Sequence, residues 1–480
     1  MADSSAPTTG RDASGLRRDK LGFLEVVALS IAILAPTFAS SMNFGMIASD
    51  AGYGVSLVFV VSVIALLFVS TAFVRFSRES NSAGSAYSYI ELGLGRNAGI
   101  VGGWALVLTY GSWTAGCSSA FGYLLSQFVS QTLGIQVPWI AFTLLAIAAI
   151  WAITLFDVSL GTRIMLGIEL VAVALLLVGI VSVTFQVGST TGLSAAPFQL
   201  GDGVSASGVG AGMVAAVLSF GGFEGAASLG EESRNPRRYI PIAILSTVIF
   251  AGILYTFVSF VEVNAYGVTP EGLAALQGSG SSVVELFGRY LGPAFTALIT
   301  LFISFSGFAT ALGSATASSR GLYQLGVDGK VPAIFSHTHP SHQTPDVANN
   351  VISAIAAVVV LAVWLASGAT IDGFLVFQYL GTIGTISLIV LYLLTCVSAV
   401  AYFAVKRHEW TWQAIFPTLG ALILLYVLWA NVAPGLEYPF NLFPYVALAL
   451  LVAGYVTSRV VLSRGREGQV ARSAATLARG

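Results

Sequence analysis

A glutamate set among glycines is the residue of this sequence best suited to chemistry. The stretch SFGGFEGAAS, residues 219–228, places Glu224 inside a long apolar segment. A carboxylate that faces lipid near the centre of a bilayer costs about 2.5 to 3.5 kcal/mol on insertion scales, so its presence calls for a role. Two compatible roles are open. Glu224 exchanges a proton during function, or its protonated form ties together a helix backbone that the glycines have loosened.

The composition shows which kind of element must hold this residue. Of the 480 residues, 56% are hydrophobic and 9% are charged, and the mean hydropathy is +0.85. This apolar content exceeds what a soluble core needs, so the sequence predicts an all-α polytopic membrane protein. Residues 1–20 are polar and basic, and we expect a cytoplasmic tail without a cleaved leader. Cys117 and Cys396 fall in apolar segments, where we expect packing rather than a disulfide or a metal site.

Twelve apolar stretches are long enough to cross a bilayer as helices. Their count is firmer than their ends, since the eighth and tenth are long enough to tilt or to protrude. The predicted spans lie near residues 22–47, 53–76, 99–128, 138–156, 160–186, 208–230, 239–263, 288–318, 350–367, 373–403, 412–433 and 440–462.

The distribution of cations tests this number of spans, because lysine and arginine stay in cytoplasmic loops during insertion. With the N-terminus inside, alternation over twelve spans places only Arg289 outside and the other 20 of the 21 cations inside. One missed or extra span in the middle would move many of these cations to the outer side of the membrane. We therefore expect a multi-pass protein of the cytoplasmic (plasma) membrane with both termini cytoplasmic.

Two of the predicted spans contain a break near the middle. Pro36 lies among small and hydroxyl residues in the first, and Gly221, Gly222 and Gly225 surround Glu224 in the sixth. Such breaks are tolerated at membrane depth where protein or a water-filled site takes over the freed backbone hydrogen bonds. Five helices separate the two breaks, so the halves that contain them run in opposite directions, as in an inverted repeat.

The two breaks together favour a binding site for a zwitterion. A half-helix that begins after a break presents N–H groups and the positive end of its dipole to a carboxylate. A half-helix that ends at a break presents carbonyl groups to an ammonium group. Proline and glycine are frequent in ordinary membrane helices, so this interpretation rests on the matched positions of the two breaks.

Three stretches resemble the permeases of the amino acid–polyamine–organocation (APC) superfamily. FGGFEGAASLGEESRNPRRYIPIAI, from residue 220, resembles the sixth-helix signature of that family. NSAGSAYSYIELGLGRNAGIVGGW (81–104) is similar to its entry to helix three, and SSRGLYQLGVDGKVPAIF (318–335) to its loop after helix eight. The resemblance implies a five-plus-five inverted repeat, the leucine-transporter-like fold, with two extra C-terminal helices. It also implies alternating access to a central amino acid site.

The same resemblance divides the chain into four parts. A cytoplasmic N-terminal tail covers residues 1–20, and the transport core, helices one to ten, covers residues 21–403. Peripheral helices eleven and twelve follow in residues 404–463, and residues 464–480 form a cytoplasmic C-terminal tail.

The substrate site implied by the resemblance lies at the two breaks and on the helices that face them. The first break reads PTFASS where the family usually has Gly-Ser-Gly, a departure that bears on how a carboxylate is held. Trp113 stands beside the residues implied in helix three. The implied residues are Pro36, Thr37, Phe38, Ala39, Ser40, Gly111, Ser112, Phe220, Gly221, Gly222, Phe223 and Phe308.

Glu224 and Glu169 are the candidates for coupling transport to an ion. In an antiporter of the family, the residue corresponding to Glu224 is linked to proton release. Sodium-independent relatives often keep a lysine in helix five, where this sequence has an apolar residue near Ala172, with Glu169 about one turn earlier. Proton coupling, sodium coupling and exchange without an ion all stay open.

The cytoplasmic end of the sixth helix is rich in charge. Glu232 and Arg234 are candidates for an inner gate whose opposite charges separate on opening. The alternative is a solvated loop that fixes the topology, which we favour for Arg237 and Arg238. The remaining acids near span ends are expected to be interfacial, namely Glu25, Glu91, Asp157, Glu262 and Asp372.

The predicted linkers carry little further chemistry. Residues 189–203 and 267–283 are expected to be external loops rich in glycine and serine. The internal stretch 336–345 holds His337, His339 and His342; we expect no metal there, although the histidines leave that question open.

Secondary transport is favoured over the other functions open to a membrane protein. A channel would show a repeated filter or a ring of polar side chains, and an enzyme would need a nucleophile, a base or a metal constellation. The stretch RFSRESNSAG does not match the motif of major facilitator transporters. We expect an amino acid or small amine as substrate, of neutral type since helices one, three and eight have no further acid at midplane. The expected partners are the lipid bilayer and a proton or sodium ion, with no cofactor and no nucleic acid.

Overall fold

The regular elements of this protein are helices wherever the structure describes the chain. A computed structural model describes residues 27, 31, 34–79, 86–156, 158–200, 204–224, 235–340, 342, 344–407, 414–432 and 438–477. Over these residues eight helices are long and apolar enough to cross a membrane, and two shorter helices, Ala206–Phe220 and Ile415–Ala430, are also apolar. The prediction of a multi-pass helical membrane protein is therefore confirmed.

The helices of the described ranges overlap every predicted span. Their bounds are α2 (Pro36–Ala51), α3 (Val55–Glu79), α4 (Ala86–Leu94), α5 (Arg96–Leu133), α6 (Trp139–Phe156), α7 (Val158–Thr190), α8 (Ala206–Phe220), α10 (Pro236–Tyr266), α11 (Pro270–Gln277), α12 (Ser282–Tyr290), α13 (Pro293–Val327), α14 (Asp346–Ala366), α15 (Gly373–Ala399), α16 (Ile415–Ala430) and α17 (Phe443–Leu477). A π-helical segment, Val400–Lys406, continues α15.

The segment expected to be an external loop at residues 267–283 is largely helical. Thr269 caps α11, since its Oγ1 accepts a hydrogen bond from the Gly272 N–H at 3.1 Å. A second short helix, α12, follows and ends before Gly292 and Pro293, which start α13. The prediction of a simple loop was wrong. Glycine and serine dominate the composition of this segment, and they obscured the cap of α11 and the amphipathic pattern of α12.

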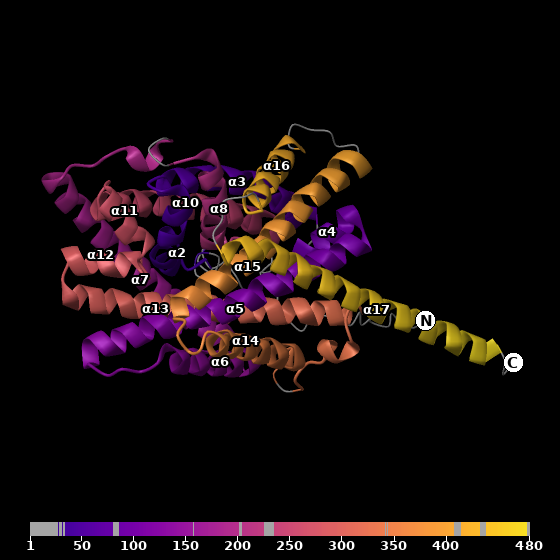
Figure 1. The fold of residues 1–480 in the computed structure, drawn as a ribbon. Coiled ribbons are helices and arrows are strands. Elements are labelled where there is room, and N and C mark those ends of the chain that lie inside the picture. The colour runs from indigo at the N-terminus through magenta and orange to yellow at the C-terminus, as the bar shows by residue number, and fades with distance from the viewer. Residues whose placement is uncertain are drawn as a thin grey trace, which may run out of the picture.

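Helices that correspond to predicted spans five apart pack against each other. The pairs are α2 with α8, α3 with α10, α5 with α13, and α6 with α14. Figure 1 shows the long helices α5 and α13 side by side in the bundle, and α17 running away from it toward the C-terminus. Outside these pairs, α16 packs on α3 and α15, and α17 packs on α15 and α5.

In the described chain one helix begins at the first predicted break, and another ends at the second. Ala35 has a φ of 46° and separates the helical position Leu34 from α2, whose first residue is Pro36. Proline suits this position because it lacks the N–H that would go unpaired. At the other break α8 ends with Phe220, and Gly222 has a φ of 103°, which favours glycine. The start of α2 and the end of α8 lie close together, since Phe38 and Ala39 of α2 and Leu218 of α8 line one cavity.

Candidate functional site

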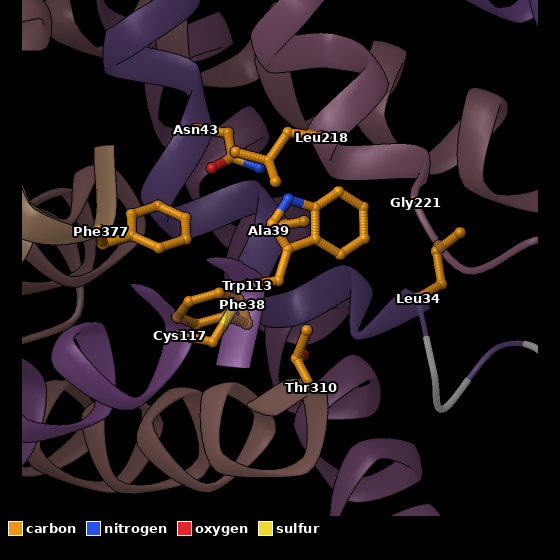
Figure 2. Close-up of a pocket in the computed structure, with 10 residues that line it drawn as sticks. All are labelled: Leu34, Phe38, Ala39, Asn43, Trp113, Cys117, Leu218, Gly221, Thr310 and Phe377. Carbon is orange, nitrogen blue, oxygen red and sulfur yellow. The ribbon is translucent and has the colours of Figure 1, made fainter. Parts of the chain in front are cut away.

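A small cavity lies where the two breaks meet. It has a volume of about 20 Å³, which is close to the space for a single water molecule. Figure 2 shows the Trp113 indole near the middle of the lining, with Asn43 and Leu218 on one side and Cys117 and Thr310 on the other. The lining residues are uncharged: Leu34, Phe38, Ala39, Asn43, Trp113, Cys117, Leu218, Gly221, Thr310 and Phe377.

Trp113 fits the cavity wall because glycines leave room for its ring. A Cβ added to Gly221 would lie 1.8 Å from the indole, and one added to Gly384 would lie 2.7 Å from it. The indole Nε1 donates to the Gly381 carbonyl at 3.3 Å, so the ring joins α5 to α15. One turn earlier on α5, Tyr110 packs edge-on against Trp113 with ring centroids 5.5 Å apart.

Tyr110 contacts both Trp113 in the cavity wall and Glu224. The hydroxyls of Tyr110 and Tyr392 donate to Oε1 and Oε2 of Glu224, each at 2.6 Å. The Gly222 N–H adds a third hydrogen bond to Oε2 at 3.2 Å. Glu224 is 9% exposed and does not line the cavity. Its carboxylate thus joins the end of α8 to α5 and α15.

A second carboxylate occupies the positive end of α2. The Thr37 N–H donates to Oε1 of Glu169, on α7, at 3.2 Å. The other oxygen, Oε2, has no hydrogen-bond partner among the described residues, and the same is true of Thr37 Oγ1 and Ser306 Oγ. All three side chains are buried. The helix dipole therefore acts on Glu169 as well as on any anion in the cavity.

Asn43 supplies a polar atom to the cavity that sequence reasoning missed. Its Nδ2 donates to Ser219 Oγ at 2.8 Å, which ties α2 to α8. Its Oδ1 is buried and has no partner among the described residues. Asn43 lies four residues after Ala39, on the same face of α2. That spacing was the signal that could have found it.

The sequence-predicted residues divide into those that line the cavity and those that support it. Phe38, Ala39 and Gly221 line it. Pro36, Thr37 and Ser40 belong to the first turns of α2 but are not among the lining residues, and Ser40 Oγ donates to the Pro36 carbonyl at 2.8 Å.

The other implied aromatic residues pack into the surrounding helices. Phe220 packs against Tyr255 with centroids 5.2 Å apart, and Phe223 packs against Tyr392 at 5.3 Å. Phe308 packs against Phe121 at 5.5 Å and does not line the cavity; Thr310 does.

Gly222 and two residues implied in helix three do not line the cavity. Gly222 forms the turn after α8. Gly111 and Ser112 precede Trp113 but are not among the lining residues, and a Cβ added to Gly111 would lie 3.3 Å from Ser318 Oγ. The proposed gate residues Glu232 and Arg234 lie outside the described residues.

The histidine stretch forms local contacts. His337 Nδ1 lies 2.8 Å from Asp346 Oδ1, and the rings of His339 and His342 have centroids 4.7 Å apart. Within the described ranges no group of three or more His, Cys, Asp or Glu residues is placed to hold a metal ion.

Comparison with known proteins identifies the family. The family model described as "Amino acid permease" matches residues 21–453. The chain belongs to the amino acid permease family. Its members are transporters rather than enzymes, and this permease has the helices of a multi-pass membrane protein.

The named relatives of this permease differ in what they carry. It is 26% identical over 368 residues to the low-affinity putrescine importer PlaP of Escherichia coli K12, covering 76% of this chain and 78% of the relative. It is 26% identical over 373 residues to the branched-chain amino acid permease BcaP of Bacillus subtilis, covering 72% and 75%. It is also 26% identical to the mouse cationic amino acid transporter 4, over 75% of this chain and 57% of the relative.

Proposed function

We propose that this permease is a secondary active transporter that moves a neutral amino acid by alternating access, coupled to protons through Glu224. The observation that carries the proposal is the meeting of the start of α2 with the end of α8 at an uncharged cavity. The positive end of one helix and the carbonyl end of the other suit the two charges of an amino acid backbone.

The lining of the cavity supports a neutral substrate. A dication such as putrescine brings a second ammonium group, and burying that charge is costly unless carboxylates or other polar groups compensate for it. The ten lining residues are uncharged and include Phe38, Trp113 and Phe377. This lining suits the apolar side chain of a branched-chain or other neutral amino acid, as in the relative named for branched-chain amino acids.

The packing of the helices supports the inverted repeat. Each helix of the pairs α2 with α8, α3 with α10, α5 with α13 and α6 with α14 contacts the helix five spans later. This pattern is expected when two five-helix halves are related by an axis in the membrane plane. We extend the proposal to twelve crossings with both termini cytoplasmic, on the charge partition of the sequence.

The surroundings of Glu224 suggest how a proton would act. As a carboxylate, Glu224 accepts from two tyrosine hydroxyls and one backbone N–H. A protonated carboxyl becomes a donor at one oxygen, so the tyrosine hydroxyl at that oxygen must either turn its hydrogen away and accept or lose the hydrogen bond. Loss of that hydrogen bond would loosen α5 or α15 from the end of α8, beside the cavity wall formed by Trp113.

The cavity must enlarge before it can hold an amino acid. On the outer side the Ser41 and Ser281 hydroxyls are 2.6 Å apart, which joins α2 to the α11–α12 hairpin. On the inner side the Tyr110–Glu224–Tyr392 cluster closes the path. In the proposed cycle these two closures open in turn.

Uptake into proteoliposomes tests the proposal. The panel contains labelled leucine, valine, alanine, arginine, ethanolamine and putrescine, with proton and sodium gradients imposed in turn. We expect a neutral amino acid to accumulate under an inward proton gradient, with putrescine and arginine excluded. Accumulation of putrescine in preference to every amino acid would overturn the substrate class, and no transport of any panel member would overturn the function.

A further inference from the structure

A buried carboxyl near the end of α10 has no part in the site described above. Glu262 is 0% exposed, and neither of its carboxyl oxygens has a hydrogen-bond partner among the described residues. From its position near a span end, Glu262 was predicted to be interfacial and to reach water, and the structure shows that this prediction was wrong. Burying an unpaired carboxylate costs far more than burying a neutral carboxyl. The conformation described here therefore favours Glu262 with a bound proton.

The α11–α12 hairpin covers this carboxyl. Figure 1 shows α11 and α12 beside α2 and α10, and both short helices pack against both of these longer ones. A Cβ added to Gly45 of α2 would lie 2.8 Å from the Leu276 carbonyl oxygen and 3.3 Å from that of Ser279. The hairpin backbone is thus seated directly on α2. At its tip, a Cβ on Gly280 would collide with the Tyr123 hydroxyl of α5.

Ser282 of α12 is the polar side chain that lies against Glu262. Its Oγ donates to the main-chain carbonyls of Ser40 and Ser41 at 3.4 and 3.3 Å, which ties α12 to α2. In this arrangement the hydroxyl can accept from a protonated carboxyl. It can donate to a carboxylate only by giving up its hydrogen bonds to α2.

The charged groups around Glu262 do not neutralise it. On the hairpin side, the Tyr266 hydroxyl donates to Glu285 Oε2 at 3.4 Å, and the Arg289 guanidinium lies 4.6 Å from the centre of the Tyr266 ring. Glu271 of α11 is exposed. No ion pair joins Glu262 to a cation in the described chain.

The other helices packed on α10 bring no cation to this end. The arginines of α3, Arg75 and Arg78, lie at its opposite end. Glu169 of α7 acts near Tyr255, about two turns of α10 before Glu262. At the end of α2, the Asp50 main chain lies against Gly208 of α8.

We propose that Glu262 is a second proton-binding site, separate from Glu224, which holds a proton while the α11–α12 hairpin is seated on α2 and releases it outward when the hairpin lifts. The proposal goes beyond the transport function and rests on it only for placing the hairpin on the outer face. Closure of the hairpin removes water from Glu262, so closure and proton binding are linked and each favours the other.

A labelling experiment on the full chain tests this link without any substrate. The two native cysteines are replaced (Cys117→Ala, Cys396→Ala), and Ser279→Cys is added as a reporter, since Ser279 is 3% exposed in the turn between α11 and α12 that is seated on α2. A membrane-impermeant maleimide is applied to proteoliposomes at external pH 5.5 to 8.5. Its rate at Ser279→Cys is divided by its rate at the exposed Glu271→Cys, which cancels the pH dependence of thiol chemistry. We expect this ratio to rise about tenfold with pH, since linkage to one proton allows up to tenfold per pH unit.

Variants of the acids decide whether Glu262 is responsible. Glu262→Gln should make the ratio low and independent of pH, whereas Glu262→Asp and Glu285→Gln should keep the rise. A flat ratio in the parent chain, a rise that survives Glu262→Gln, or a rise that is lost in Glu285→Gln would each overturn the proposal. Loss of folding in Glu262→Gln is separated from these outcomes by Glu262→Asp, which keeps the carboxyl. The result does not depend on the transport panel, so the two proposals fail separately.

Discussion

At the scale of single residues, the proton role of Glu224 depends on its two tyrosine donors. Glu224→Gln keeps an oxygen that can accept from one tyrosine, but the amide cannot take up a proton. We expect counterflow exchange to persist and proton-driven accumulation to fall to the level of empty liposomes. Tyr392→Phe, the control, removes one hydrogen bond and keeps the carboxyl, so accumulation should slow without losing its pH dependence. An unchanged pH dependence in Glu224→Gln would remove this residue from the coupling role.

Gly221 lies directly against the Trp113 ring, so a substitution at Gly221 tests the packing of the cavity wall. An added Cβ would lie 1.8 Å from the indole, so Gly221→Ala should push the ring toward the cavity of about 20 Å³ and abolish exchange. Overpacking of this kind typically costs about 1 to 3 kcal/mol. Adding Trp113→Phe should restore part of the activity, which is measured as counterflow. Gly313→Ala is the matched control, since a Cβ there meets nothing within 4 Å. Equal activity of both alanine variants would contradict the packing argument.

At the scale of elements, the hairpin of α11 and α12 closes the outer side of the site. The Oγ atoms of Ser41 and Ser281 lie 2.6 Å apart, so cysteines at these positions are close enough to form a disulfide. In a chain without native cysteines, oxidation of Ser41→Cys with Ser281→Cys should block exchange, and reduction should restore it. Either cysteine alone should leave exchange unaffected by oxidant. A cross-linked protein with full exchange would show that the hairpin does not move in the cycle.

At the scale of the whole molecule, the charge partition fixes the expected orientation. We predict that an impermeant maleimide added to intact cells labels Ala195→Cys, in the exposed segment after α7, and spares Thr338→Cys, in the segment after α13. Both segments are exposed, and the native cysteines are buried. Both cysteines should react once the membrane is permeabilised. Labelling of Thr338→Cys from outside would contradict the odd number of crossings between the two positions.

Much of the architecture could be predicted because it follows from local pattern. The apolar runs predicted helices that the structure confirms, and Pro36 and the Gly221–Gly222 pair predicted where α2 begins and where α8 ends. The hairpin was missed, since glycine and serine around α11 and α12 outweighed a single cap at Thr269. Asn43 was missed because its spacing of four residues from Ala39 is a weak signal, and its role depends on Ser219 of the partner helix.

The sequence by itself determined the class of protein, the positions of the helix breaks and the presence of a carboxyl at one of them, because hydrophobicity, proline and glycine act within a few residues. Only the tertiary structure decided what each carboxyl meets. Glu224 receives two tyrosine hydroxyls from α5 and α15, Glu169 receives the start of α2, and Glu262 lies unpaired beneath the hairpin. These partners lie far away along the chain, and burial and hydrogen bonding depend on which helices pack together, which no local pattern encodes.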